Sequence, residues 1–315
     1  MKTVLVDLED APSVHIVVFG AGAMGSFFGG LLSSRHEVLL IGRADHVRAV
    51  SEHGLRITGK TIRLVRPEAA TKVPRGAKPD VVLLSTKAYD TESAMVHLRP
   101  FARSALFVTL QNGLDNADTI ARSAERVVAG TTSHGVTFLG PGEIRHAGVG
   151  DTVIGPWKGV DEADLVRLRD VFDDVGIPAR LTSDVRTELW AKVVLNASIN
   201  PVSALAGVPN GRLVRDRRLR EAVEVVCREA ASVARAEGAR IDPGEILHRT
   251  LLVARRTASN RSSMLQDLEA GRRTEIDAIT GAIVAAAERR GLEVPVNGVL
   301  LSLVRARESA TSRSA

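Results

Sequence analysis

The sequence predicts an α/β domain built on a doubly wound parallel sheet, followed by an all-helical domain. Three observations support this prediction. An apolar strand at residues 14–19 runs directly into a glycine-rich turn and a helix. Further apolar strands alternate with helical stretches through the first half of the chain. From about residue 184 the helical period takes over, and 315 residues suffice for two such domains.

The glycine-rich turn has the pattern of a dinucleotide site. Gly20, Gly22 and Gly25 follow the strand and lead into a helix at residues 26–32. In a βα turn, these glycines permit the tight turn, the approach of a pyrophosphate and close helix packing, in that order. An ordinary glycine-rich turn is the alternative, but the flanking strand and helix supply the context that a nucleotide site requires. We expect the cofactor loop to consist of Gly20, Ala21, Gly22, Ala23, Met24 and Gly25.

The second strand, residues 37–41, is expected to end beside the adenosine ribose of the cofactor. It is followed by Gly42 and Arg43. An arginine suits a 2′-phosphate, whereas an acidic residue would accept hydrogen bonds from a free 2′-hydroxyl. The sequence therefore favours NADPH/NADP+ over NAD. Asp45 lies two residues further on, which leaves open that Arg43 is a solvated loop charge.

Two later strands end in polar loops. The pattern places strands at residues 81–85 and 106–110 and helices at residues 91–98 and 115–124. Because ligands bind outside the carboxyl ends of such strands, Lys87 and Asn112 become candidates for contact with the cofactor. Turn or capping roles are the alternative.

The remaining pattern divides the chain. Glycine-rich, strand-like segments at residues 130–156 are expected to finish the sheet and shape the edge of a cleft, before a helix at 161–175 and a short strand at 179–182. We predict an N-terminal extension at 1–13, a nucleotide-binding domain at 14–183, a helical domain at 184–308 and a disordered tail at 309–315.

The first helix of the second domain is expected at residues 185–200, ended by Pro201. Lys192, Asn196 and Asn200 recur every four residues and so share one face. Aliphatic side chains on the other faces indicate a buried helix whose polar stripe lines a cavity or an interface, with a solvated stripe as the alternative. Lysine is rare in this arginine-rich chain, and none follows Lys192.

Three other segments have plain structural interpretations. Asn210 begins an Asn-Gly turn signal, which is typical of a helix connection. Ser263 lies in a Ser-Ser-Met run. Thr274 is a candidate N-cap of an apolar helix running to residue 287, which would make Glu275 a first-turn carboxylate that complements the helix dipole.

Composition narrows the function classes. The net charge is +5, but aromatic residues make up only 3%, which argues against a nucleic-acid partner. Residues 1–12 contain three acidic residues, so we expect neither a signal peptide nor membrane association. The single cysteine, Cys227, fits a small core residue in a reducing cytoplasm. No metal site is predicted.

Several separated motifs together resemble the ketopantoate reductase family, from residue 14 to about 308. They are Gly-Ala-Gly-Ala-Met-Gly at 20–25, Ser-Thr-Lys at 85–87, Gln-Asn-Gly at 111–113, Trp190-x-Lys192 with Asn196 and Asn200-Pro201, Pro-Asn-Gly at 209–211, Ser-Ser-Met at 262–264, and Thr-Glu-Ile-Asp at 274–277. In combination they are far more specific than any one of them alone.

The resemblance implies a Rossmann domain, a helical substrate domain like the C-terminal domain of 6-phosphogluconate dehydrogenase, and an active site between them. The implied reaction is NADPH-dependent reduction of 2-dehydropantoate to pantoate, in pantothenate and coenzyme A biosynthesis. It implies that Lys192 is the general acid and Glu275 the second catalytic residue, with Asn112 and Lys87 near the nicotinamide and its ribose. It also implies that the substrate is held by Asn196, Asn200, Asn210 and Ser263.

Other functions stay open at this point. The family pattern matches weakly through residues 133–150, which border the cleft, so another small branched 2-oxo acid is an alternative substrate. A non-catalytic dinucleotide sensor is a third alternative, against which Lys192 and Glu275 both count. The sequence does not determine the oligomeric state, and a homodimer is compatible with it.

Overall fold

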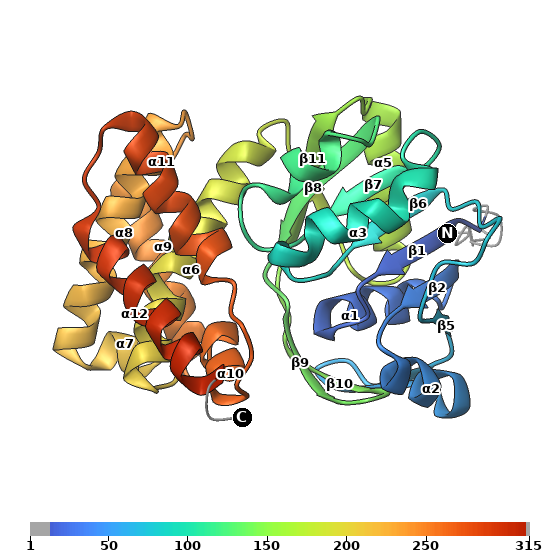
Figure 1. Ribbon diagram of the computed structural model, residues 1–315, viewed down its shortest axis with the longest axis horizontal. Helices are drawn as coiled ribbons and strands as arrows, with labels where there is room; N and C mark the ends of the chain where they lie inside the picture. Colours follow the sequence, from blue (N-terminus) through green and yellow to red (C-terminus); the bar gives the residue numbers. More distant parts are fainter. Residues whose placement is uncertain (1–12, 313–315) are drawn as a thin grey trace, which may run out of the picture.

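The computed structural model in Figure 1 describes residues 13–312 and consists of two domains side by side. The first half of the chain forms the α/β domain, drawn in blue to green, and the second half forms the helical domain, drawn in yellow to red. The predicted order of fold classes is confirmed. All but one residue of the expected N-terminal extension lies outside the described range.

The main sheet has eight strands in the order β12-β11-β8-β7-β6-β1-β2-β5. Neighbours pair in parallel except β11 and β8. β11 and β12 therefore run antiparallel to the other six strands, and the prediction of a parallel sheet is wrong at this edge. The chain leaves β1 for β2 on one side and returns to β6 on the other, which is where ligands bind in doubly wound sheets. The strands are β1 (His15–Phe19), β2 (Glu37–Ile41), β5 (Glu68–Ala70), β6 (Val81–Leu84), β7 (Leu106–Thr109), β8 (Arg126–Thr132), β11 (Thr152–Lys158) and β12 (Ala179–Leu181).

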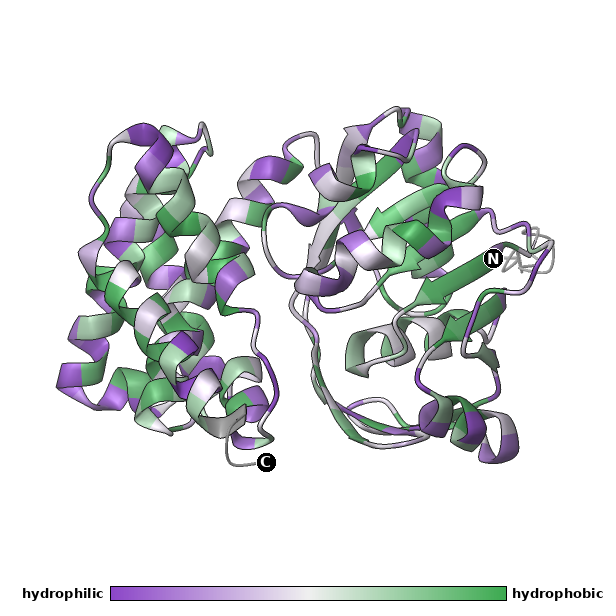
Figure 2. Ribbon diagram, viewed as in Figure 1, coloured by the Kyte–Doolittle hydropathy of each residue, from purple (hydrophilic) through white to green (hydrophobic). Residues whose placement is uncertain are grey.

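Helices cover both faces of this sheet, which explains why its central strands are apolar without alternation. Ile16 and Val18 of β1 pack in the core shared with α1 (Ala23–Leu32) and α5 (Glu162–Asp173). Val17, between them, packs on the opposite face with α3 (Thr91–Leu98) and α4 (Asn116–Ala121). Figure 2 shows the resulting hydrophobic strands inside a mixed outer layer.

A second, four-stranded sheet lies against α1 and was not predicted. Its order is β4-β3-β10-β9, and the segment at residues 130–156 therefore serves two sheets instead of finishing one. Leu55, Ile57 and Ile144 anchor the second sheet to the core around Phe27 of α1. The alternation in these short strands was too brief to be recognised. They are β3 (Leu55–Gly59), β4 (Arg63–Val65), β9 (Gly135–Gly140) and β10 (Glu143–Gly148), with α2 (Ala44–His53) preceding them.

The helical domain is organised around α6 (Val185–Ala206), which packs against most of the other helices of that domain. The prediction that this helix ends at Pro201 is wrong, because Pro201 lies inside it and Gly207 caps it in the left-handed conformation, with φ 66°. Proline costs a helix one backbone hydrogen bond. Here residues 197–204 are buried, and their packing outweighs that loss.

The end of the chain also departs from expectation. The helix predicted from Thr274 begins with a π-helical turn, Asp277–Gly281, before α11 (Ala282–Arg290). The final helix, α12 (Pro295–Ser312), includes residues 309–312, so that part of the predicted disordered tail is helical, while residues 313–315 lie outside the described range. The other helices are α7 (Arg212–Arg215), α8 (Arg217–Ala236), α9 (Pro243–Arg256) and α10 (Ser263–Glu269), with 3-10 turns at Ala88–Asp90 and Arg99–Phe101.

Candidate active site

The glycine loop has the geometry that its sequence predicts. Gly20 has φ 109°, and a Cβ added there would lie 2.6 Å from the backbone nitrogen of Thr86. A Cβ on Gly25 would lie 2.2 Å from the carbonyl oxygen of Gly20. Gly22 has no heavy atom within 4 Å of that position, so this side of the loop is open. No side chain caps α1, which leaves its first N–H groups available to a ligand.

Arg43 lies at the N-terminus of α2, directly after β2, and is exposed. The backbone places it beside the glycine loop, because Ala21 N donates to Ile41 O at 2.8 Å. Asp45, the acidic residue nearby, is paired with Arg48 at 2.9 Å. No ion pair of Arg43 occurs among residues 13–312, so its guanidinium remains available to an anion.

Glu275 is held by both nearby loops of the α/β domain. Its Oε1 accepts from the backbone N–H of Ala88 at 3.1 Å, and its Oε2 accepts from Asn112 Nδ2 at 2.9 Å. The Lys87 ammonium lies 3.7 Å from Oε2. The carboxylate is 8% exposed, and these contacts join residues up to 187 positions apart in the chain. They place Glu275 beyond the carboxyl ends of β6 and β7.

Lys192 lies on α6 and reaches back to the sheet domain. Its Nζ donates to the carbonyl oxygen of Thr132, at the end of β8, at 2.8 Å. Burial lowers the pKa of Lys192 to about 8, and the Glu275 carboxylate opposes that fall. The ammonium is thus poised to release its proton near neutral pH, which an arginine in its place could not do.

The pKa of Lys87 is shifted in the opposite direction to that of Lys192. Burial alone would lower its pKa, but the carboxylates of Glu275 and Asp267 together outweigh that effect and raise it. Lys87 Nζ pairs with Asp267 Oδ2 at 2.7 Å, and Asp267 also binds Arg272 at 2.9 Å. Of the two lysines near Glu275, Lys87 therefore keeps its charge while Lys192 can titrate.

The polar stripe on α6 is confirmed as one face of a largely buried helix. Asn196 is partly buried and Asn200 is 7% exposed. Within the described part of the chain, neither side chain makes a hydrogen bond to protein. Both amide groups therefore have hydrogen-bonding capacity to offer a ligand.

Asn210 and Ser263 have contacts of their own in the helical domain. Asn210 Nδ2 donates to Thr257 Oγ1 at 2.9 Å, and its Oδ1 is buried without a partner. Ser263 is the exposed first residue of α10, whereas Ser262 caps that helix by accepting from Leu265 N. No hydrogen bond or ion pair within residues 13–312 joins Asn210 or Ser263 to Lys192 or Glu275.

Two contributors to this region were not predicted from the sequence. Asp267 is buried and pairs with Lys87. The one sequence feature that could have indicated this role is a carboxylate next to apolar Leu268 on a short helix. Ala88 contributes a backbone N–H, which no sequence pattern reveals. Both act across the boundary between the domains.

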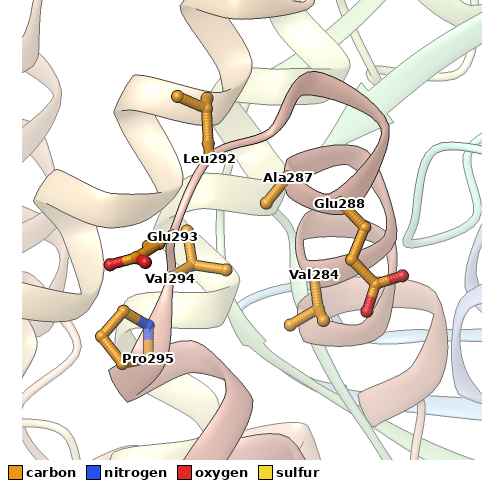
Figure 3. A pocket seen from close by; sticks show the side chains of 7 residues that line it. All are labelled: Val284, Ala287, Glu288, Leu292, Glu293, Val294 and Pro295. Carbon is orange, nitrogen blue, oxygen red and sulfur yellow. The ribbon is translucent and has the colours of Figure 1, made fainter.

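Hollows elsewhere on the molecule do not coincide with this group. The pocket in Figure 3, of about 430 Å³, lies between α11 and α12 and is lined by apolar side chains with Glu288 and Glu293. None of its lining residues was predicted to be functional. The described residues include no cluster of three or more candidate metal ligands and no helix long and apolar enough to cross a membrane.

Comparison with known proteins gives a single result over both domains. Residues 16–159 match the family described as Ketopantoate reductase PanE/ApbA, and residues 184–308 match Ketopantoate reductase PanE/ApbA C terminal. The 2-dehydropantoate 2-reductase of Pyrococcus horikoshii is 39% identical over 301 residues, which is 94% of this chain and 98% of that protein. That of Halobacterium salinarum is 39% identical over 93% of this chain and 98% of that protein.

Solved structures agree with this result. A PanE/ApbA family ketopantoate reductase from Ralstonia eutropha superposes with a TM-score of 0.86 at 36% identity, over 95% of this chain and 99% of that one. D-mandelate dehydrogenase, solved with NADH and anilino(oxo)acetate, gives a TM-score of 0.90 at 28% identity over the same shares of both chains. The resemblance found in the sequence is confirmed, and the chain belongs to the ketopantoate reductase family.

Proposed function

We propose that this enzyme reduces 2-dehydropantoate to pantoate with NADPH. The observation that carries the proposal is a titratable Lys192, on the helical domain, whose charge is coupled to a Glu275 held by the loops of the sheet domain. Relatives that are 39% identical over nearly the whole chain bear the name of this activity.

The glycine loop supports a dinucleotide cofactor. Its open side at Gly22 and the uncapped N-terminus of α1 offer room and N–H donors to a pyrophosphate. Arg43 has no acidic partner among the described residues and stands where a 2′-phosphate would lie, which favours NADPH over NADH. Lys87 and Asn112, beyond β6 and β7, would contact the nicotinamide end. When bound, the reduced nicotinamide supplies a hydride.

The chain's own residues would handle the other half of the reaction. A hydride added to a ketone carbon leaves negative charge on the carbonyl oxygen, and the Lys192 ammonium both stabilises that charge and donates a proton to it. Glu275 keeps Lys192 protonated by opposing the effect of burial on its pKa. Asn196 and Asn200 bind substrate oxygens with amides that have no protein partner in residues 13–312. Asn210 and Ser263 would complete the substrate site.

One observation favours a second candidate substrate class. The D-mandelate dehydrogenase structure, which holds anilino(oxo)acetate, is as similar in fold as the ketopantoate reductases. The same machinery would therefore reduce a 2-oxo acid with a different branched or aromatic substituent. Nothing in Lys192 or Glu275 distinguishes the two, because both act on the carbonyl group that these acids share.

The test is a substrate panel. Purified enzyme is mixed with NADPH or NADH and each of a series of 2-oxo acids, including ketopantoate and benzoylformate, and the loss of nicotinamide absorbance is followed. We expect the highest kcat/KM with ketopantoate and NADPH. A higher value with benzoylformate would assign the second candidate, and no turnover with any 2-oxo acid would refute both.

A further inference from the structure

The two donors that hold Glu275 come from separate loops, and a chain of buried hydrogen bonds ties those loops together. Ala88 follows β6, and Asn112 follows β7. Between them lie Gln111, Thr91 and Asn116, which are 8%, 2% and 6% exposed. Within residues 13–312, none of these three side chains makes a hydrogen bond to Glu275, so the chemistry derived above does not account for them.

The series of hydrogen bonds starts at the side chain of Gln111. Its Nε2 donates to the carbonyl oxygen of Thr86 at 2.8 Å and to Thr91 Oγ1 at 2.9 Å. The Thr91 hydroxyl then donates to Asn116 Oδ1 at 2.8 Å. Asn116 Nδ2 donates in turn to the carbonyl oxygen of Asn112 at 2.7 Å. The loop after β6 is thus tied to the loop after β7 twice, directly by Gln111 and again through Thr91 and Asn116.

The donor and the acceptor of every hydrogen bond in this series are fixed. Backbone carbonyl oxygens only accept, so those of Thr86 and Asn112 require the amide nitrogens of Gln111 and Asn116 to face them. Thr91 must then accept from Gln111 and donate to Asn116. Within residues 13–312 its single hydroxyl is the only link between the two amides, and alanine or valine at this position would break the link.

We propose that Thr91 is a positioning residue for Glu275, acting with Gln111 and Asn116. The Gln111 bond anchors the loop that leads to Ala88 N, and the Asn116 bond anchors the backbone of Asn112. With both anchored, the two donors reach the two carboxylate oxygens of Glu275 at 3.1 and 2.9 Å. This inference rests on the proposed function, in which Glu275 and Lys192 act together.

Displacement of Glu275 has a consequence that can be measured. Its carboxylate opposes the effect of burial on the pKa of Lys192, and Coulomb interactions weaken with distance. Lys87 also faces Glu275, at 3.7 Å, and is itself paired with Asp267. If Glu275 moves towards Lys87 and away from Lys192, the alkaline limb of turnover shifts to lower pH.

The experiment compares Thr91→Val, which keeps the shape but removes the hydroxyl, with Thr91→Ser, which keeps the hydroxyl. Thr91→Val is expected to lower kcat by roughly tenfold to a hundredfold, the effect of a small misplacement of reacting groups. Its alkaline limb should move to lower pH, and its Kd for NADPH should stay near the wild-type value. Thr91→Ser should restore kcat and the position of the limb.

Thr250→Val is the matched control, because Thr250 is also fully buried and its hydroxyl donates to Ile246 O on α9, in the helical domain. It should lose stability without a shift of the alkaline limb. If Thr91→Val does not fold, Asn116→Leu removes the donor to the Asn112 carbonyl without adding a charge and should give the same shift.

Two outcomes overturn the inference: wild-type kcat and an unmoved limb in Thr91→Val, or equal losses of kcat in Thr91→Val and Thr250→Val. Failure of the wild-type enzyme to reduce any 2-oxo acid would refute the proposed function instead. The two failures are therefore distinguishable in one set of measurements.

Discussion

The glycine loop and the surroundings of Glu275 are assembled in opposite ways. The loop is a single run of six residues, from Gly20 to Gly25, and its shape follows from the absence of Cβ atoms at Gly20 and Gly25. Glu275 receives its partners from Lys87, Ala88 and Asn112, more than 160 positions away. The loop can form within the α/β domain, where Gly20 also meets the backbone of Thr86, whereas the second site requires both domains to be folded and docked.

The difference predicts separable failures. Damage to the loop should weaken cofactor binding, and damage to the cross-domain site should lower turnover while the cofactor still binds. Each variant below tests whether the two properties separate as expected.

The largest expected effect is at Lys192. Lys192→Arg keeps a positive charge but cannot transfer a proton near neutral pH, so kcat should fall by about a hundredfold to ten-thousandfold. Affinity for NADPH, measured by fluorescence titration, should be unchanged because the glycine loop is intact. Lys192→Ala should show a similar loss. Turnover near the wild-type value in Lys192→Arg would mean that charge alone suffices.

The pH dependence of turnover tests the same role of Lys192. The pKa of Lys192 is lowered to about 8, so the ammonium form that donates a proton prevails below that pH. Turnover should be maintained below about pH 8 and decline as pH rises through it. A profile of kcat against pH checks this, and the alkaline limb should be absent from the residual activity of Lys192→Arg. A wild-type profile that is flat to pH 10 would contradict the assignment.

Gly25→Ala and Gly22→Ala test the local site. A Cβ on Gly25 would clash with the Gly20 carbonyl oxygen, so this variant should lose about 1–3 kcal/mol of unfolding free energy together with NADPH binding. A Cβ on Gly22 meets no protein atom. The free energy of unfolding of Gly22→Ala should therefore lie within about 0.5 kcal/mol of the wild-type value. Its affinity for NADPH should nevertheless be lower than that of wild type. Equal cofactor affinity in Gly22→Ala and wild type would show that the open side is not the pyrophosphate site.

Arg43→Ala is expected to change the choice of cofactor. Loss of one charge-assisted contact costs about 1.5–3 kcal/mol, so the ratio of kcat/KM for NADPH to that for NADH should fall roughly tenfold to a hundredfold. Activity with NADH should barely change, which makes NADH the internal control. A constant ratio would remove Arg43 from the 2′-phosphate site.

The smallest effect is expected at the polar stripe. Asn196→Ala removes an amide with no protein partner in residues 13–312, so it should leave the melting temperature unchanged. Loss of a neutral hydrogen bond to substrate, about 0.5–1.5 kcal/mol, should raise the substrate KM roughly two- to tenfold. A large fall in melting temperature would favour a structural role instead.

The sequence predicted what depends on local pattern. The bounds of β2 and α3 agree with the structure residue for residue, and the glycine turn has the predicted geometry. The run of apolar residues in β1 was informative because helices cover both of its faces. Local pattern alone assigned Glu275 only a place in the first turn of a helix, and the resemblance to a family was needed to pair it with Lys192.

What the sequence could not predict depends on tertiary packing. Pro201 continues a helix because buried neighbours stabilise it, against its own propensity. The second sheet pairs β3 with β10, strands that are more than 80 residues apart. Asp267 gained a role only because α10 docks beside Lys87. In each case the deciding interaction is with a residue that is distant in the chain.

The contact between Ala88 and Glu275 has a consequence for how this enzyme can evolve. Because the donor is a backbone N–H, every residue except proline would preserve it, and position 88 is free to drift as far as this bond is concerned. The Asn112 contact depends on a side chain and can be lost by a single codon change. The backbone contact to the Glu275 carboxylate is thus robust to mutation, whereas the side-chain contact must be maintained by selection.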